Sequence, residues 1–196
     1  VSQTKVSNGS SVDTIEPVIT PVKSENDKRS YAYHTLDNGL RVLLISDPAT
    51  EMSAAALDVA TGSRDDPEDR QGLAHFLEHM LFLGTEKYPQ AGEYQAFVSA
   101  HGGQHNAFTS LEQTNYFFDV DPDFFPEALD RFAQFFVAPL FSAEYVDREK
   151  NAVHSEYQAR IRDDGRRLWD VYRELYDPAN PASTFSVGSL ETLADN

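Results

Sequence analysis

The spacing of apolar side chains predicts β-strands in four stretches of the chain. Residues 40–45 form a nearly unbroken apolar run after the turn signal Asp37-Asn38-Gly39, and residues 53–61 form a second such run. Residues 104–110 and 114–120 also have strand character, and only three residues separate them. This short separation predicts that the last two strands pair as a hairpin.

Apolar positions three and four residues apart predict helices in the remaining stretches. The predicted helices cover residues 73–83, 91–101 and 122–137, and a longer one that begins at 142, runs past 156 and breaks near Gly165. The first of them follows an acidic cluster and is so apolar that we expect it to be buried on most sides. The order of the elements predicts an α+β fold in which helices pack on an antiparallel sheet of mixed strand order.

The ordered part of the chain is expected to be one domain. Residues 1–30 are polar, rich in Ser, Thr, Asn and Lys, and lack apolar periodicity, so we expect a flexible tail there. Residues 31–196 are long enough for one substantial core. The final residues carry no recognisable terminal signal, so we expect this domain to be truncated at its C-terminal end.

Composition narrows the classes of function. The formal net charge of −16 disfavours nucleic acids and anionic membranes as partners. No apolar run approaches the roughly 20 residues that a membrane-spanning helix needs, so no membrane insertion is expected. The chain contains no Cys, which excludes thiolate nucleophiles and thiolate metal ligands.

His75, Glu78 and His79 lie within five residues of one another on the first predicted helix. Side chains three and four residues apart share one helix face, so two imidazoles and a carboxylate would converge. Neutral imidazole is a good zinc ligand, and a carboxylate beside the metal can act as a general base. The pattern is HxxEH, the inverted form of the HExxH zinc peptidase motif. The alternative interpretation is a helix whose two His face solvent or another polar group.

A catalytic zinc site usually takes three protein ligands, so a third must come from elsewhere. Glu149 and Glu156 lie seven residues apart on about the same face of the long predicted helix. The helical rise separates them by roughly 10 Å, so one metal ion cannot bind both. One can be the ligand while the other orients ligands or pairs with a base, and spacing does not decide between them. His154 is a third candidate, although it points away from their common face.

Several segments together resemble the pitrilysin and insulysin family of inverted-motif zinc metallopeptidases. They follow one another in the family's order and cover about residues 31–196. The matching segments are Asp37-Asn38-Gly39-Leu40, residues 72–84, Lys87-Tyr88-Pro89, His101-Gly102-Gly103, Asn106-Ala107 and residues 148–153 with Glu156.

The resemblance implies a zinc-dependent endopeptidase that holds one Zn²⁺ per chain and acts on oligopeptides or small proteins. It implies that His75, His79 and Glu156 bind the zinc, that Glu78 is the general base and that Glu149 orients the ligands. It further implies that the strand Asn106-Ala107-Phe108-Thr109 binds the backbone of a peptide substrate; the alternative for this segment is an ordinary buried strand.

The resemblance also implies a missing partner. Such enzymes have two homologous halves that enclose a chamber, so the rest of the parent polypeptide is an expected partner and the isolated fragment is expected to be weakly active or inactive. Similarity to pitrilysin-type enzymes and a start without a leader lead us to expect a periplasmic location, with the cytoplasm as the alternative.

Two other functions share features of this sequence. S-ribosylhomocysteine lyases also contain an HxxEH segment, but they use a Cys ligand that this chain lacks. The alternative function is that of a non-catalytic zinc-binding or peptide-binding member of the same fold, working in a larger complex. Such members usually lose residues of the motif, whereas this chain has His75, Glu78, His79 and Glu156.

Overall fold

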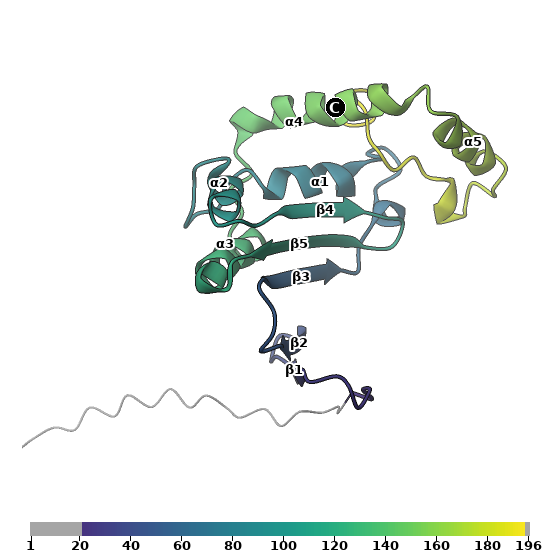
Figure 1. Cartoon of the computed structure of the whole chain (residues 1–196). Helices are drawn as coiled ribbons and strands as arrows, with labels where there is room; N and C mark the ends of the chain where they lie inside the picture. The colour runs from purple at the N-terminus through teal and green to yellow at the C-terminus, as the bar shows by residue number, and fades with distance from the viewer. Residues whose placement is uncertain (1–20, 195–196) are drawn as a thin grey trace, which may run out of the picture. The chain divides into compact units, whose positions relative to one another are not determined.

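The computed structural model describes residues 21–194 (Figure 1). The chain forms two compact units, the first ending at Thr50 and the second beginning at Glu51. Most of the tail expected at residues 1–30 falls on residues 1–20, which lie outside the described part. The expected catalytic domain contains both the small hairpin of the first unit and the whole of the second.

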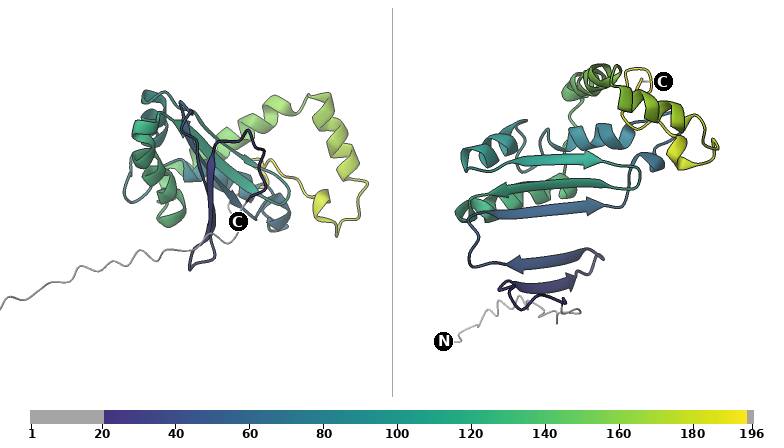
Figure 2. Two further views of the ribbon diagram at one scale, coloured as in Figure 1. Left: turned by 60° about the horizontal axis from the view of Figure 1, so that its bottom comes forward. Right: turned by 45° about the vertical axis from the view of Figure 1, so that its right-hand side comes forward.

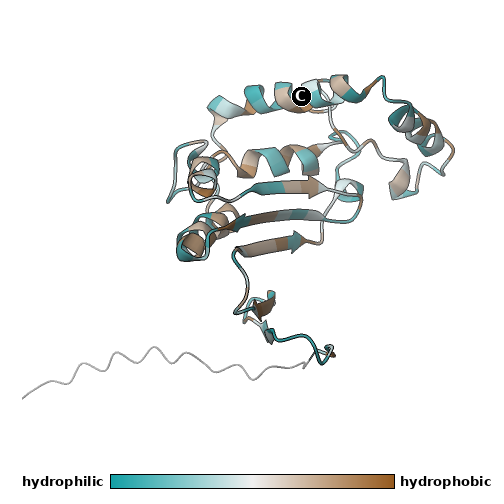
Figure 3. Ribbon diagram, in the orientation of Figure 1, coloured by the Kyte–Doolittle hydropathy of each residue, from teal (hydrophilic) through white to brown (hydrophobic). Residues whose placement is uncertain are grey.

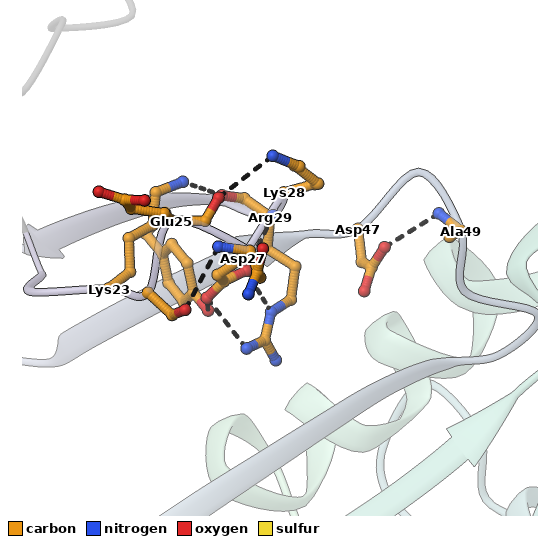
Figure 4. Close-up of polar contacts among 10 residues, drawn as sticks. Lys23, Glu25, Asp27, Lys28, Arg29, Asp47 and Ala49 are labelled. Atoms are coloured by element: carbon orange, nitrogen blue, oxygen red, sulfur yellow. Dashed lines mark hydrogen bonds and ion pairs between the residues drawn. The ribbon is translucent and has the colours of Figure 1, made fainter.

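The first unit is a two-stranded antiparallel hairpin. Strand β1 (Ser30–Thr35) pairs with β2 (Arg41–Ser46), which is the predicted apolar run. Gly39 has a φ of +85°, a conformation that glycine adopts without strain, and it closes the predicted turn. Before β1, Arg29 donates hydrogen bonds to the carboxylate of Asp27, which holds the pKa of that carboxyl below its usual range (Figure 4).

The second unit is built on a three-stranded antiparallel sheet. Its strands are β3 (Ser53–Val59), β4 (His105–Thr109) and β5 (Thr114–Val120), in the order β3-β5-β4. The predicted hairpin is confirmed, because β4 pairs with β5 in the register Ala107 to Tyr116. Alternate side chains of the central strand, Tyr116, Phe118 and Val120, are buried. Because β4 is the last strand in the order β3-β5-β4, it forms an edge of this sheet.

Residues 51–194 also contain five α-helices, three of which contact the sheet (Figure 2). They are α1 (Leu73–Leu81), α2 (Glu93–Ala100), α3 (Phe125–Val137), α4 (Ala143–Arg160) and α5 (Asp164–Arg173), with short 3₁₀ helices at Ser63–Asp65, Pro122–Phe124 and Pro181–Ser183. The main core joins the sheet to α2, α3 and the end of α1, and strand β3, which packs against it, is mostly hydrophobic (Figure 3). The buried members of the core are Leu81, Tyr94, Val98, Tyr116, Phe118, Val120, Ala128, Phe132 and Phe135. The predicted α+β class with helices on an antiparallel sheet is confirmed.

The break after the long helix falls slightly before the predicted position. Helix α4 ends at Arg160, and α5 begins at Asp164 after a short turn. The side chain of Asp163 accepts a hydrogen bond from the backbone N–H of Arg166 and so caps the new helix. This capping Asp explains why a new helix begins here.

Helix α1 lies between the edge strand β4 and helix α4 (Figures 1 and 2). Its start is fixed by Asp66, whose carboxylate accepts the backbone N–H groups of Gly72 at 2.7 Å and Ala74 at 2.8 Å. The helix is covered on most sides, as expected, but Leu73 and Leu77 are exposed on one face, the latter at 43%. Two faces are covered, by the strand and by α4, while a third is open.

Candidate metal centre

His75 and His79 come from successive turns of α1 and face α4. Their ring centroids are 4.9 Å apart and their planes are perpendicular. The amphipathic pattern of α1 buries Met80 and Leu81 on one side, which directs the two imidazoles toward the neighbouring helix. The first helix therefore supplies two nitrogen ligands at a fixed separation.

Helix α4 brings Glu156 opposite both imidazoles. Glu156 Oε2 lies 3.5 Å from His75 Nε2 and 3.9 Å from His79 Nε2. The other carboxylate oxygen, Oε1, lies 3.2 Å from the Arg160 guanidinium, one turn further along the helix. Arg160 thus leaves Oε2 as the atom that faces the two imidazoles.

The spacing of these three groups suits a zinc ion. One ligand atom from each of His75, His79 and Glu156 lies within 4.8 Å of the others, and no other such group occurs among residues 21–194. Ligands at about 2.0–2.2 Å from a tetrahedral zinc lie about 3.3–3.6 Å from one another. Two neutral imidazoles and a carboxylate are also a donor set that zinc prefers. The residues present therefore fit the metal.

The second nitrogen of each imidazole faces a different group. His75 Nδ1 lies 2.6 Å from the backbone carbonyl oxygen of Val187, far along the chain. His79 Nδ1 lies 3.5 Å from Glu149 Oε2, while Glu149 Oε1 is held by Arg148. Outer partners of this kind orient imidazole ligands and fix which nitrogen faces the metal. Val187 was not expected from the sequence, because a backbone carbonyl has no residue-type signature.

Glu78 points toward the sheet and is only 8% exposed. The Thr109 hydroxyl, on β4, donates a hydrogen bond to Glu78 Oε2 at 2.6 Å. Next to it, the Thr114 hydroxyl donates to the backbone carbonyl of Thr61 at 3.0 Å. Each hydroxyl has a single proton, so Thr114 donates its proton to Thr61 and Thr109 donates its proton to Glu78. Burial, with the added effect of the Glu78 charge, raises the pKa of the Tyr116 phenol nearby.

If Glu78 is the general base that the family resemblance implies, Thr109→Val should impair catalysis without affecting zinc binding. Valine has the shape of threonine but removes the donor that fixes one oxygen of Glu78, so the carboxylate loses its orientation. We expect kcat of the full-length protein to fall by about 10-fold, with KM for a peptide and zinc content unchanged. Thr109→Ser keeps the hydroxyl and should restore most of kcat; a serine variant as slow as the valine variant would show that the hydroxyl alone does not account for the loss.

Strand β4 carries the four residues expected to bind a substrate backbone. Asn106 and Phe108 are exposed, the latter at 45%, whereas Ala107 and Thr109 are half-buried. The Asn106 side-chain oxygen accepts the backbone N–H of Ala107 at 2.9 Å, so this N–H is not bonded to β5. The strand is an edge strand with at least one backbone donor turned away from its partner.

His154 does not join the cluster. Its Nδ1 accepts a hydrogen bond from the backbone N–H of Leu190 at 3.4 Å, and its ring lies beside Tyr157. The residue packs instead against the C-terminal part of the described chain.

Known proteins are similar to this chain in sequence and in fold. The insulin-degrading enzyme of Homo sapiens is 53% identical over 171 residues, which cover 87% of this chain and 17% of that protein. The insulin-degrading enzyme-like 1, peroxisomal, of Arabidopsis thaliana is 49% identical over 172 residues, 88% of this chain and 18% of that protein. A crystal structure of pitrilysin superposes with a TM-score of 0.84 at 47% identity and covers 89% of this chain and 19% of that one. The chain thus spans about a fifth of the length of these relatives.

The relatives correct the expected location. Those from animals and plants have about half of their aligned residues identical, their cells have no periplasm, and the one whose name states a compartment is peroxisomal. The expectation of a periplasmic location is therefore wrong. Separately, no helix within residues 21–194 has the length and hydropathy needed to cross a membrane.

The family itself follows from a direct match. The model of the insulinase family, peptidase family M16, matches residues 41–174, which include both histidines of α1 and Glu149 and Glu156 of α4. The resemblance to the pitrilysin and insulysin family is confirmed, and the chain belongs to the insulinase family of peptidases.

Proposed function

We propose that this chain is the metal-binding part of a zinc-dependent endopeptidase that hydrolyses oligopeptides or small proteins. The observation that carries the proposal is that His75, His79 and Glu156 each bring one ligand atom within 4.8 Å of the others, with Glu78 on the same short helix as the two histidines. In this proposal His75, His79 and Glu156 hold the metal, and Glu149 orients His79.

A zinc ion held there supplies a Lewis acid and a water of lowered pKa. Glu78 takes the proton of the attacking water and later returns it to the leaving amine. The hydrogen bond from Thr109 holds Oε2 of Glu78, which leaves the other oxygen to exchange the proton. Because the Thr109 hydroxyl orients Glu78 as a base would need, a catalytic function is favoured over the alternative of a non-catalytic, peptide-binding member of the fold.

The edge strand is the proposed binding site for substrate. A peptide added alongside Asn106-Ala107-Phe108-Thr109 would extend the sheet and bring its backbone next to Glu78. Because Asn106 occupies the N–H of Ala107, its side chain would turn away when a substrate carbonyl takes that place. Strand addition recognises backbone groups, so it suits an enzyme with varied peptide substrates.

The rest of a longer polypeptide is the proposed partner. The human relative is named for the degradation of insulin, and this chain spans 17% of it. We propose that a second homologous half completes the substrate chamber and that residues 1–196 alone are weakly active or inactive.

Removal of the metal tests the proposed function. The full-length protein is incubated with a chelator, dialysed and assayed with an internally quenched peptide. We expect hydrolysis to fall to background and to return when about one equivalent of zinc is added. Full activity in protein shown by metal analysis to lack zinc would contradict the proposal, and rapid cleavage by residues 1–196 alone would contradict the need for a second half.

A further inference from the structure

We infer that residues 185–193, here called the strap, position the metal centre and that docking of the strap is coupled to metal binding. The inference rests on the proposed function, since it assumes that His75 is a ligand. It goes further because it assigns a role to a segment that contributes no ligand side chain and lies beyond residue 174, where the family model ends.

The strap fixes the protonation pattern of the His75 ring. A carbonyl oxygen can only accept a hydrogen bond, so the 2.6 Å contact between His75 Nδ1 and the Val187 oxygen requires the proton on Nδ1. In a neutral imidazole the lone pair then lies on Nε2, the atom that faces Glu156 Oε2 at 3.5 Å. The strap therefore selects the tautomer and the ring orientation that a metal ligand needs.

The backbone of the strap passes unusually close to the start of α1. A Cβ atom built on Gly72 would lie 2.2 Å from Gly188 Cα, so this approach is possible only because Gly72 has no side chain. The same start of the helix is bonded to the strap through Gln71, whose side-chain oxygen accepts the backbone N–H of Phe185 at 3.1 Å. The strap is thus fastened directly beside the turn that carries His75.

The strap also packs on α4, the helix that carries Glu156. Val153 is fully buried, and its Cγ1 lies 3.2 Å from the Cβ position of Gly188. Leu193 is 4% exposed and flanks the same glycine, while Phe185 forms an edge contact with the Tyr157 ring. One segment consequently holds both ligand-bearing helices and one ligand ring.

These contacts make metal binding and strap docking reciprocal. Zinc binds with full affinity only when His75 Nε2 is aimed at the site, and that aim depends on the docked strap. By linkage, any change that undocks the strap weakens zinc binding, and zinc in turn stabilises the docked strap by the same factor. Loss of an outer partner of a metal ligand typically lowers affinity by about 10–100-fold.

Two glycines at the N-terminal ends of helices provide a matched test in the full-length protein that contains this chain. Gly72 and Gly92 each precede a helix with positive φ, +92° and +86°, so alanine imposes similar backbone strain at both. Only Gly72 would clash with the strap, because nothing lies within 4 Å of the Cβ position of Gly92. We expect Gly72→Ala to raise the zinc dissociation constant about 10–100-fold in competition with a chromophoric chelator, and Gly92→Ala to change it less than about 2-fold.

A second pair covers the case in which Gly72→Ala does not fold. Leu193→Ala loosens the strap at its buried anchor, and Leu175→Ala makes the same change at a side chain that is 76% exposed. Only the first should weaken zinc binding. In the unmodified protein, hydrogen exchange of residues 185–193 should slow when zinc is added.

The outcomes separate the strap inference from the proposed function. Equal zinc affinities within a folded pair of variants, or strap exchange unaffected by zinc, would overturn the inference while leaving a zinc-binding peptidase in place. Absence of zinc binding by the unmodified protein would overturn the proposed function and the inference together.

Discussion

Glu78→Gln is expected to lower kcat of the full-length protein by about 10²–10⁴-fold while its zinc content stays at one ion per metal centre. Glutamine keeps the size of the side chain and an oxygen that accepts the Thr109 hydroxyl, so the local packing is preserved. It cannot take up a proton, so the attacking water loses its base. Initial rates with an internally quenched peptide and elemental analysis of the same sample measure both quantities.

Glu86→Gln is the matched control for this change. Glu86 is exposed and lies in the turn after α1, so the same substitution there should leave both kcat and zinc content unchanged. If Glu78→Gln retains most of the activity, Glu78 is not the base. If it loses the zinc instead, Glu78 acts on the metal rather than on the water.

Glu156→Gln is expected to raise the zinc dissociation constant by more than about 100-fold, beyond the range typical of outer partners. The substitution replaces a charged carboxylate, 3.5 Å and 3.9 Å from the two imidazole Nε2 atoms, by a neutral amide that binds zinc poorly. The packing of α4 should remain, because the glutamine has nearly the same shape. Competition with a chromophoric chelator measures the affinity directly.

The regular elements could be predicted where the apolar pattern is strong. The β4–β5 hairpin and helices α1 to α4 follow from their periodicity, and the helix break near Gly165 was placed within a few residues. Strand β1 was not predicted, because its sequence Ser-Tyr-Ala-Tyr-His-Thr is short and mostly polar. Its strand conformation is supported by pairing with β2, which is a tertiary property of the hairpin.

The site residues that lie close together in the sequence could also be predicted, whereas the contacts from Thr109 and Val187 that orient them could not. His75, Glu78 and His79 are close in sequence, so helix geometry alone groups them. The choice of Glu156 over Glu149 depended on the family resemblance, since both lie on one face of one helix. Spacing could not have shown which carboxylate meets the imidazoles.

The two orienting contacts come from segments whose positions only the fold determines. Thr109 reaches Glu78 because β4 lies against α1, and its hydroxyl carries no signature in a strand of mixed residues. Val187 acts through its backbone, so no side-chain pattern could reveal it. Gly72 permits the close approach of the strap, and this role can be interpreted only once the two segments are seen together.

The zinc dissociation constants of the unmodified full-length protein, Glu156→Gln and Glu149→Gln, measured side by side by chelator competition, test the proposed metal centre most directly. The ligand assignment predicts a loss of more than about 100-fold for Glu156→Gln and a smaller loss, about 10–100-fold, for Glu149→Gln, which removes only the partner of His79 Nδ1. Equal affinities for all three proteins, or a larger loss for Glu149→Gln than for Glu156→Gln, would contradict it.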